Sequence, residues 1–265
     1  MIKSTDVLNF VLPASHYTLS RGTYGPDPRQ GWDLYLPHEV TGVPLVFVYG
    51  GAWREGERAD YEFVGHALSG LGHPVFIPDY RLYPAVRYPD FVDDVAASIA
   101  WFEANAVALT GAPLSRYVLM GHSSGAHTAA LLATDTAFLA AHGVSAELSG
   151  LIGLAGPYEL PLDDPEVSDV FAQAPAQAVQ PPLRVSGAEP PVLLLHGLND
   201  ERVVPRHSRR FADALAEAGV PVTLHLYPRV NHVRIIAGLA APLRFLNDSY
   251  ADTAEFLRQH AGRDL

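Results

Sequence analysis

Short apolar runs alternate along most of the chain with longer stretches of helical periodicity. Several of the runs are continuously apolar, which is typical of strands covered on both faces. We expect strands at 32–37, 44–50, 74–80, 116–122, 150–156, 190–197 and 222–228. We expect helices near 60–70, 90–106, 124–141, 206–218 and 250–260. This alternation predicts the α/β class, with a mostly parallel central sheet flanked by helices.

One long stretch departs from the alternation. Residues 157–189 are rich in proline, alanine and acidic residues and have no clear period. They form either a surface excursion or a small lid over the ends of the strands. No repeat or linker divides the sequence, so we expect a single domain over 1–265. Before the first expected strand, a short helix over 4–12 is the most that the sequence indicates.

Composition and charge narrow the classes of partner. The 265 residues include 18 basic and 29 acidic side chains, a net charge of −11 that argues against a nucleic-acid partner. The absence of cysteine excludes disulfides, thiolate metal sites and a thiol nucleophile, and neither a metal nor a cofactor is expected. No apolar run approaches the roughly 20 residues of a membrane span.

The cellular address and the oligomeric state are only weakly indicated. The N-terminal stretch is too weak for a signal peptide, which favours a cytoplasmic address, with an already trimmed export leader as the alternative. A homodimer remains an open alternative to the monomer.

The motif "GHSSG" at 121–125 joins an expected strand to an expected helix. A strand-to-helix turn this sharp pushes the side chain at its apex out of the sheet, and the flanking glycines leave the space for it. Ser123 stands at the apex, where the dipole of the following helix favours negative charge. The alternative is an ordinary turn with a serine N-cap. The placement predicts that Ser123 is a nucleophile.

A serine hydroxyl needs a base and an orienting acid. In a fold of this type both follow in the sequence, the acid before the histidine, on loops after later strands. Asp200 stands three residues after the strand expected at 190–197, with Glu201 as its competitor. His232 follows the last expected strand and alone among the 12 histidines meets both order and position. We therefore predict a catalytic triad of Ser123, Asp200 and His232.

Two glycines and an alanine, Gly50-Gly51-Ala52, stand in a row where the apolar run at 44–50 ends. Such residues let a ligand approach backbone N–H groups closely. Acyl transfer through a serine forms an oxyanion that needs donors placed in advance. We expect the N–H groups of Gly51 and Ala52 to supply them, together with that of Ser124, the residue after the nucleophile. Phosphate binding is set aside because the G-x-x-x-x-G-K-[ST] pattern is absent.

Further polar residues are expected to support this site rather than to react. His122 lies inside the turn and should pack beside Ser123, and His196 precedes the loop of the predicted acid and can order it. Asp79 and Arg81 follow a strand closely, and we expect them to form a buried salt bridge beneath the glycine loop.

Seven motifs stand in one order along most of the chain from about residue 20. They are "YGGAW" (49–53), "PDYRLYP" (78–84), "YPDFVDDV" (88–95), "GHSSGAH" (121–127), "LAGPYEL" (154–160), "HGLNDERVVP" (196–205) and "YPRVNH" (227–232). With them the chain resembles α/β-hydrolases of the carboxylesterase group that includes hormone-sensitive-lipase-like esterases and kynurenine-formamidase-like enzymes. The resemblance implies the α/β-hydrolase fold, the same triad and an oxyanion hole of Gly51, Ala52 and Ser124.

The sequence departs from the family at two points. Tyr49 stands where the family motif H-G-G-x-W has a histidine, which in the family braces the oxyanion loop. Too few residues precede the expected sheet for the long helical cap of the hormone-sensitive-lipase-like members, so the cap is small or absent. An open, shallow pocket follows, which suits short acyl groups. Trp53 and Tyr158 either line it or pack in the core.

The sequence thus predicts a serine carboxylesterase that acts on a small-molecule ester with a short acyl chain. An arylformamidase or other small amidase uses the same machinery and stays open, as does an esterase that removes acetyl or feruloyl groups from carbohydrate. A non-catalytic binding protein on a hydrolase scaffold is less favoured, because all three triad positions are filled.

Overall fold

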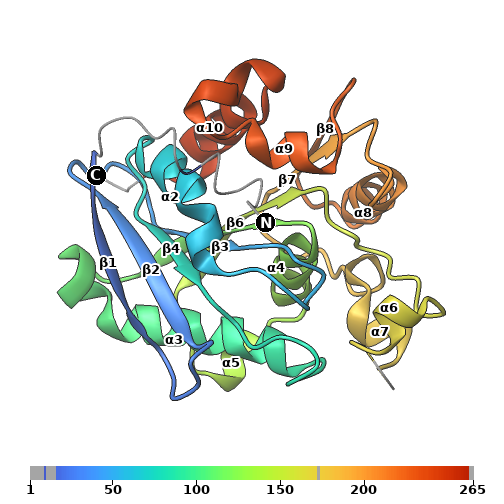
Figure 1. Cartoon of the computed structure of the whole chain (residues 1–265), viewed down its shortest axis with the longest axis horizontal. Helices are drawn as coiled ribbons and strands as arrows, with labels where there is room; N and C mark the ends of the chain where they lie inside the picture. The colour runs from blue at the N-terminus through green and yellow to red at the C-terminus, as the bar shows by residue number, and fades with distance from the viewer. Residues whose placement is uncertain (1–8, 10–15, 172–173, 263–265) are drawn as a thin grey trace.

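A mostly parallel sheet of eight strands runs through the molecule (Figure 1). The computed structural model describes residues 9, 16–171 and 174–262. The strands are β1 (Tyr17–Thr23), β2 (Gly31–Pro37), β3 (Leu45–Val48), β4 (Val75–Pro78), β5 (Arg116–His122), β6 (Glu147–Leu154), β7 (Val192–Gly197) and β8 (Val222–Tyr227). Their order is β1-β2-β4-β3-β5-β6-β7-β8; β2 pairs antiparallel with both β1 and β4, and all other neighbours pair in parallel. The predicted α/β sheet is confirmed.

Helices flank this sheet, with α2 and α10 together on one side and α3 and α5 on the opposite side (Figure 1). The longer helices are α2 (Glu62–Ser69), α3 (Asp90–Thr110), α4 (Ser124–Thr134), α8 (Arg206–Glu217) and α10 (Ser249–His260). The short ones are η1 (Arg58–Tyr61), α5 (Ala137–Ala141), α6 (Pro165–Ser168), α7 (Ala176–Val179), η2 (Pro181–Leu183), α9 (His232–Ala237) and η3 (Ala241–Leu246). None of the helices in the described ranges is long and apolar enough to cross a membrane.

The elements differ from the sequence expectations in a few places. Strand β1 was not expected, because only Tyr17 of its 7 residues is buried and it lies at the edge of the sheet. The helix expected over 124–141 is interrupted at Asp135, where α4 ends. The short helix α9 was missed because too few residues define a period. The helix expected over 4–12 lies outside the described residues, apart from Asn9.

The central strands form a rigid platform. Every residue of β3, β4 and β7 is buried, as expected for parallel strands that are covered on both faces. Phe76 of β4 stacks on Phe102 of α3 at 4.5 Å between ring centroids. Fully burying such side chains stabilises the fold by about 1.5–3 kcal/mol each. The loops that follow β3, β5, β7 and β8 therefore leave one end of the sheet from well-fixed positions.

The segment at 157–189 contains α6, α7 and η2 and packs against α4 and its surroundings. Phe171 makes an edge contact with Trp53 at 4.8 Å and with Phe91 at 5.6 Å between ring centroids. His127 of α4 donates from Nε2 to the carbonyl oxygen of Val179 at 2.7 Å. Burial lowers the pKa of His127 to about 4, so the ring is neutral at neutral pH. That this segment acts as a lid stays a prediction.

Candidate active site

Three predicted site residues lie in one hydrogen-bonded chain at the carboxyl end of the sheet. Ser123 follows β5, Asp200 follows β7, and His232 begins α9 after β8. The distance from Ser123 Oγ to His232 Nε2 is 2.8 Å, and that from His232 Nδ1 to Asp200 Oδ2 is 2.7 Å. These are hydrogen-bond distances, so the three groups have the arrangement that activation of a serine hydroxyl requires.

The turn at Ser123 is sharp and strained. Ser123 has φ 55° and ψ −126°, a left-handed conformation that costs a non-glycine residue about 1–3 kcal/mol. A Cβ on Gly121 would clash with the backbone at Gly125, and one on Gly125 would clash with the carbonyl of Val48. Both glycines of the motif are thus required by close backbone packing. The Ser123 side chain makes no N-cap hydrogen bond to α4, so it does not serve as the serine N-cap of an ordinary turn.

The loop after β7 holds Asp200 in place. Its Oδ1 accepts hydrogen bonds from the backbone N–H groups of Arg202 at 3.0 Å and Val203 at 2.9 Å. His196 donates from Nε2 to the carbonyl oxygen of Val203 at 2.8 Å, so it orders this loop as expected. Although burial alone would raise it, hydrogen bonds from His196 and His232 hold the pKa of Asp200 below its usual range.

The ionised Asp200 fixes the protonation of His232. Because a carboxylate only accepts hydrogen bonds, the network assigns the ring proton to Nδ1 of His232 and leaves the lone pair of Nε2 facing Ser123. The competing acid, Glu201, has an exposed side chain, and the hydrogen bond of Nδ1 goes to Asp200. The arrangement is that of a general base aimed at a hydroxyl.

The glycine loop lies directly beside Ser123. A Cβ on Gly50 would stand 2.8 Å from the Cβ of Ser123, so only glycine allows this approach. Gly51 has φ 139° and Ala52 has φ 51°. Across the described ranges of the chain, the N–H groups of Gly51 and Ala52 donate to no other backbone group. The N–H of Ser124, in the first turn of α4, has no partner within the helix. The oxyanion hole itself stays a prediction.

Tyr49 braces the glycine loop in place of the family histidine. Its hydroxyl donates to Asp79 Oδ1 at 2.8 Å and accepts from Arg29 Nη2 at 2.8 Å. The same nitrogen of Arg29 donates to the carbonyl oxygen of Gly56 at 2.7 Å, at the far end of the loop. The hydroxyl of Tyr80 donates to the carbonyl oxygen of Tyr49 at 2.7 Å. The loop is therefore fastened at both ends.

The predicted salt bridge between Asp79 and Arg81 is wrong. The chain turns away after β4, so the two side chains diverge. Asp79 lies beneath the glycine loop and pairs with the guanidinium of Arg58, whose backbone N–H also donates to it at 2.8 Å. Arg81 turns to α3 and pairs with the buried Asp94 at 2.8 Å. Asp94 stands among the core-facing positions of the helical pattern of α3, and this was the sequence signal for the pair that Arg81 and Asp94 form.

Replacing Tyr49 by phenylalanine tests the bracing network. The variant leaves a buried Asp79 oxygen and an Arg29 nitrogen without this partner, so we expect the free energy of unfolding to fall by about 1–3 kcal/mol. We also expect kcat to fall, because the loop that carries the candidate donors loses an anchor. Urea unfolding and the rate of ester hydrolysis measure the two effects.

Tyr117 supplies the matched control for this variant. Its hydroxyl is buried and has no hydrogen-bond partner among the residues that the structure describes. Tyr117→Phe, in the adjacent strand β5, also removes a buried tyrosine hydroxyl, yet it should leave the urea midpoint unchanged or raise it. Equal destabilisation of both variants would show that the Tyr49 hydroxyl has no bracing role.

His122 supports the base from inside the turn, a role that the sequence did not define. It donates from Nε2 to the carbonyl oxygen of His232 at 3.1 Å, and the two ring centroids lie 5.0 Å apart. Burial, together with the nearby ring of His232, lowers the pKa of His122 to about 3. The ring is therefore neutral at neutral pH and acts as a fixed donor that holds the backbone of the base.

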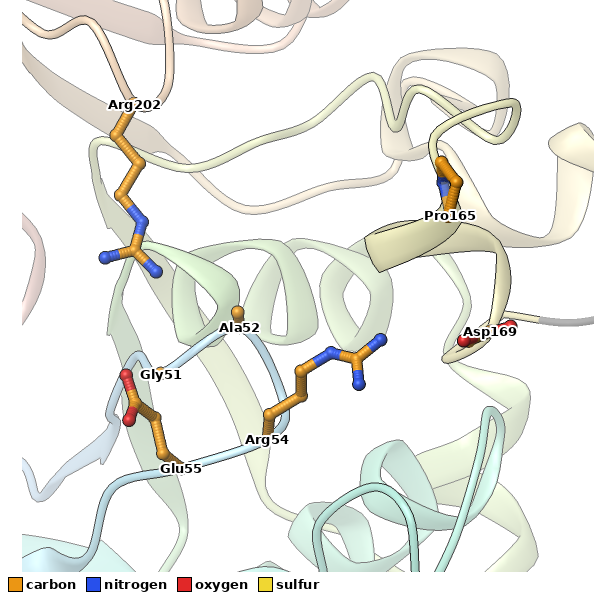
Figure 2. A pocket seen from close by; sticks show the side chains of 7 residues that line it. All are labelled: Gly51, Ala52, Arg54, Glu55, Pro165, Asp169 and Arg202. Atoms are coloured by element: carbon orange, nitrogen blue, oxygen red, sulfur yellow. The ribbon is translucent and has the colours of Figure 1, made fainter.

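A cavity of about 400 Å³ opens at the glycine loop (Figure 2). Figure 2 shows the side chain of Arg202 reaching toward Gly51 and Ala52 from one side, while Pro165 and Asp169 stand on the other. The lining residues are Gly51, Ala52, Arg54, Glu55, Pro165, Asp169 and Arg202. The charged members were missed because exposed charges follow no period in the sequence.

Neither Trp53 nor Tyr158 lines this cavity. Trp53 is buried and donates from its indole nitrogen to Thr128 Oγ1 at 3.2 Å. Tyr158 is fully buried against Phe211, with 4.7 Å between ring centroids. Of the two alternatives that the sequence left open, packing in the core describes both side chains.

Comparisons with known proteins find a family model, curated relatives and solved structures that resemble this chain. The BD-FAE family model matches residues 32–154. An isoprenylcysteine α-carbonyl methylesterase of Arabidopsis thaliana is 31% identical over 86% of this chain and 59% of its own length. The kynurenine formamidase of Meyerozyma guilliermondii is 25% identical over 77% of this chain and 83% of its own. The crystal structure of esterase B from Lactobacillus rhamnosis superposes with a TM-score of 0.78 at 21% identity, over 96% of this chain and 89% of that one.

The solved structure bears on the fold, and the curated relatives bear on the class of enzyme. The solved structure shows the α/β-hydrolase fold, which confirms the expectation from the motifs. The two curated relatives are named as an esterase and a formamidase. The chain spans less than two thirds of the length of the Arabidopsis relative, at 59%.

Proposed function

Because the chain is similar to α/β-hydrolase esterases of the hormone-sensitive-lipase-like kind, we propose that it is a serine carboxylesterase that hydrolyses short-chain acyl esters of small molecules. The observation that carries the proposal is the hydrogen-bonded chain from Ser123 through His232 to Asp200. Its position beside a glycine loop with open N–H groups supports acyl transfer over other uses of a serine.

Acylation begins with the hydroxyl of Ser123. Nε2 of His232 takes its proton as the oxygen attacks the ester carbonyl, and Asp200 stabilises the imidazolium that forms. The carbonyl oxygen becomes negatively charged and accepts hydrogen bonds from the N–H groups of Gly51, Ala52 and Ser124. Each such donor lowers the barrier by about 3 kcal/mol. The imidazolium then protonates the leaving alcohol, and an acyl-enzyme remains.

Deacylation repeats the same steps with water. His232 takes a proton from the water as it attacks the acyl-enzyme, the same N–H groups hold the second oxyanion, and the proton returns to Ser123 Oγ as the acid leaves. No metal or cofactor takes part in this scheme.

The lining of the cavity at the glycine loop favours short acyl groups. Long acyl chains need a buried apolar tunnel, whereas four charged side chains line this cavity, Arg54, Glu55, Asp169 and Arg202. We expect kcat/KM for 4-nitrophenyl esters to be highest between acetyl and butyryl and to fall about 100-fold or more by lauroyl, because the added methylenes find no apolar surface. Initial rates across the series, below the critical micelle concentration, measure this.

The ester series tests the preference for short acyl chains separately from the esterase activity. A maximum at octanoyl to lauroyl would contradict the short-chain proposal and leave the esterase proposal standing. No hydrolysis of any ester in the series would contradict both.

A small amidase is the second candidate. It is favoured by the kynurenine formamidase relative, of whose length this chain covers 83%. The same triad serves amides when the leaving amine is protonated well. N-formylkynurenine tested beside 4-nitrophenyl acetate decides the matter: a higher kcat/KM for the formamide would favour the amidase.

A further inference from the structure

A second cavity, of about 510 Å³, has His232 on its wall. Three arginines also line it, Arg202, Arg229 and Arg234, against one carboxylate, that of Glu201. We call this cavity the arginine cleft. It lies where the loops after β7 and β8 meet, next to the candidate base.

The three arginines of the cleft form no salt bridge within the described part of the chain. In the described part of the chain no carboxylate lies within 4.0 Å of their guanidinium nitrogens, unlike Arg58 and Arg81, which are paired with aspartates. Nη1 of Arg234 donates to the carbonyl oxygen of Arg229 at 3.2 Å, which links the two residues and leaves their other donors open. Asn231 accepts the backbone N–H of Arg234 at 2.9 Å and fixes the start of α9. The positive lining therefore stands on an ordered turn.

The charge of the arginine cleft contrasts with its surroundings. The cavity at the glycine loop is balanced, with Arg54 and Arg202 against Glu55 and Asp169, whereas the cleft has three cations and one anion. Arg202 lines both cavities and stands between them. The whole chain has a net charge of −11, which repels an anion at long range. A local excess of arginine in such a protein attracts negative charge to one place.

The chemistry of the proposed reaction says which part of a substrate reaches this cleft. The leaving alcohol must lie beside His232 Nε2 to be protonated, while the carbonyl oxygen points to the glycine loop. Guanidinium groups bind carboxylate and phosphate oxygens through paired hydrogen bonds. We propose that the arginine cleft binds an anionic oxyacid group, a carboxylate or a phosphate, on the alcohol part of the ester. This inference rests on the proposed esterase function and names the class of substrate.

A matched pair of esters tests the inference, 3-carboxyphenyl acetate and its neutral counterpart 3-carbamoylphenyl acetate. The ratio of their kcat/KM values should exceed one in the wild type. It should fall about tenfold in Arg202→Gln and in Arg234→Gln, since hydrogen bonds to charged groups contribute most of the preference, and it should shrink as salt is added. Arg209→Gln, an exposed arginine of α8 outside the cleft, is the matched control and should keep both the ratio and the rates. The rates are measured as the release of the phenol, which is monitored by chromatography.

A third ester locates the anion. Mono-4-nitrophenyl glutarate places the carboxylate on the acyl side and is compared with 4-nitrophenyl butyrate. Arginine dependence of this pair alone would overturn the assignment to the alcohol side. Product inhibition by 3-hydroxybenzoate or by 3-hydroxyphenyl phosphate, stronger than by 3-hydroxybenzamide, supports the cleft and shows which oxyacid it prefers.

The failure of this inference differs from the failure of the proposed function. If 3-carbamoylphenyl acetate and 4-nitrophenyl acetate are not hydrolysed, the esterase proposal fails. If they are hydrolysed but the anionic ester has no advantage, or keeps its advantage in both arginine variants, the arginine cleft is not the binding site for an anion and the esterase proposal stands.

Discussion

Ser123→Ala is expected to lower kcat for 4-nitrophenyl acetate by about five to six orders of magnitude. The variant removes the only oxygen within hydrogen-bond distance of His232 Nε2 among the described side chains, at 2.8 Å, so no acyl-enzyme can form. The small rate that remains would come from the oxyanion donors and from binding alone. Initial rates with the purified variant, corrected for spontaneous hydrolysis, measure the loss.

The fold should survive this change, because alanine meets the same strain as serine at φ 55°. Circular dichroism and the urea midpoint check this. Ser124→Ala is the matched control: it removes the neighbouring hydroxyl but keeps the backbone N–H, so we expect its kcat to stay within about tenfold of wild type. An ethyl fluorophosphonate should label the wild type at Ser123, as peptide mass spectrometry would show. Substantial turnover by folded Ser123→Ala would mean that another residue attacks the ester.

The sequence predicts the framework of the site because each element leaves a local signal. Buried parallel strands are continuously apolar over four to eight residues, so the ends of β5 and β7 can be located to within a few positions, whereas β8 is mostly half-buried and is marked by the alternation of apolar and polar residues in VTLHLY. Ser123, Asp200 and His232 each follow one of these ends, and the parallel order brings the ends together. The close packing around Ser123 can also be predicted from the sequence, because the glycines beside it mark a place where the backbone leaves no room for a larger residue.

The sequence does not predict which charges pair or what surrounds the site. Asp79 pairs with Arg58 and not with Arg81, since the partner is set by how β4 and the following loop approach η1. The arginine cleft is assembled from two loops that follow different strands, and nothing periodic marks its members. Such contacts depend on tertiary approach, which hydrophobic patterning leaves undefined.

Asp200→Asn is expected to lower kcat by about 10⁴-fold while the protein stays folded. The amide oxygen can still accept the N–H groups of Arg202 and Val203, which bond Oδ1 at 3.0 Å and 2.9 Å. Its nitrogen then faces Nδ1 of His232 as a donor. That contact favours the tautomer with the proton on Nε2, which cannot take the proton of Ser123. Steady-state rates with 4-nitrophenyl acetate measure the loss.

Glu201→Gln is the matched control, because it neutralises the next carboxylate along the same loop. Its side chain is exposed and His232 does not depend on it, so we expect a loss of less than about tenfold. The reverse order of effects would make Glu201 the orienting acid. A loss in Asp200→Asn accompanied by a lower urea midpoint would have a different meaning: the carboxylate would then act mainly by holding the loop, because His196 and Val203 share its hydrogen bonds. Loss of rate at an unchanged midpoint isolates the effect on the tautomer of His232.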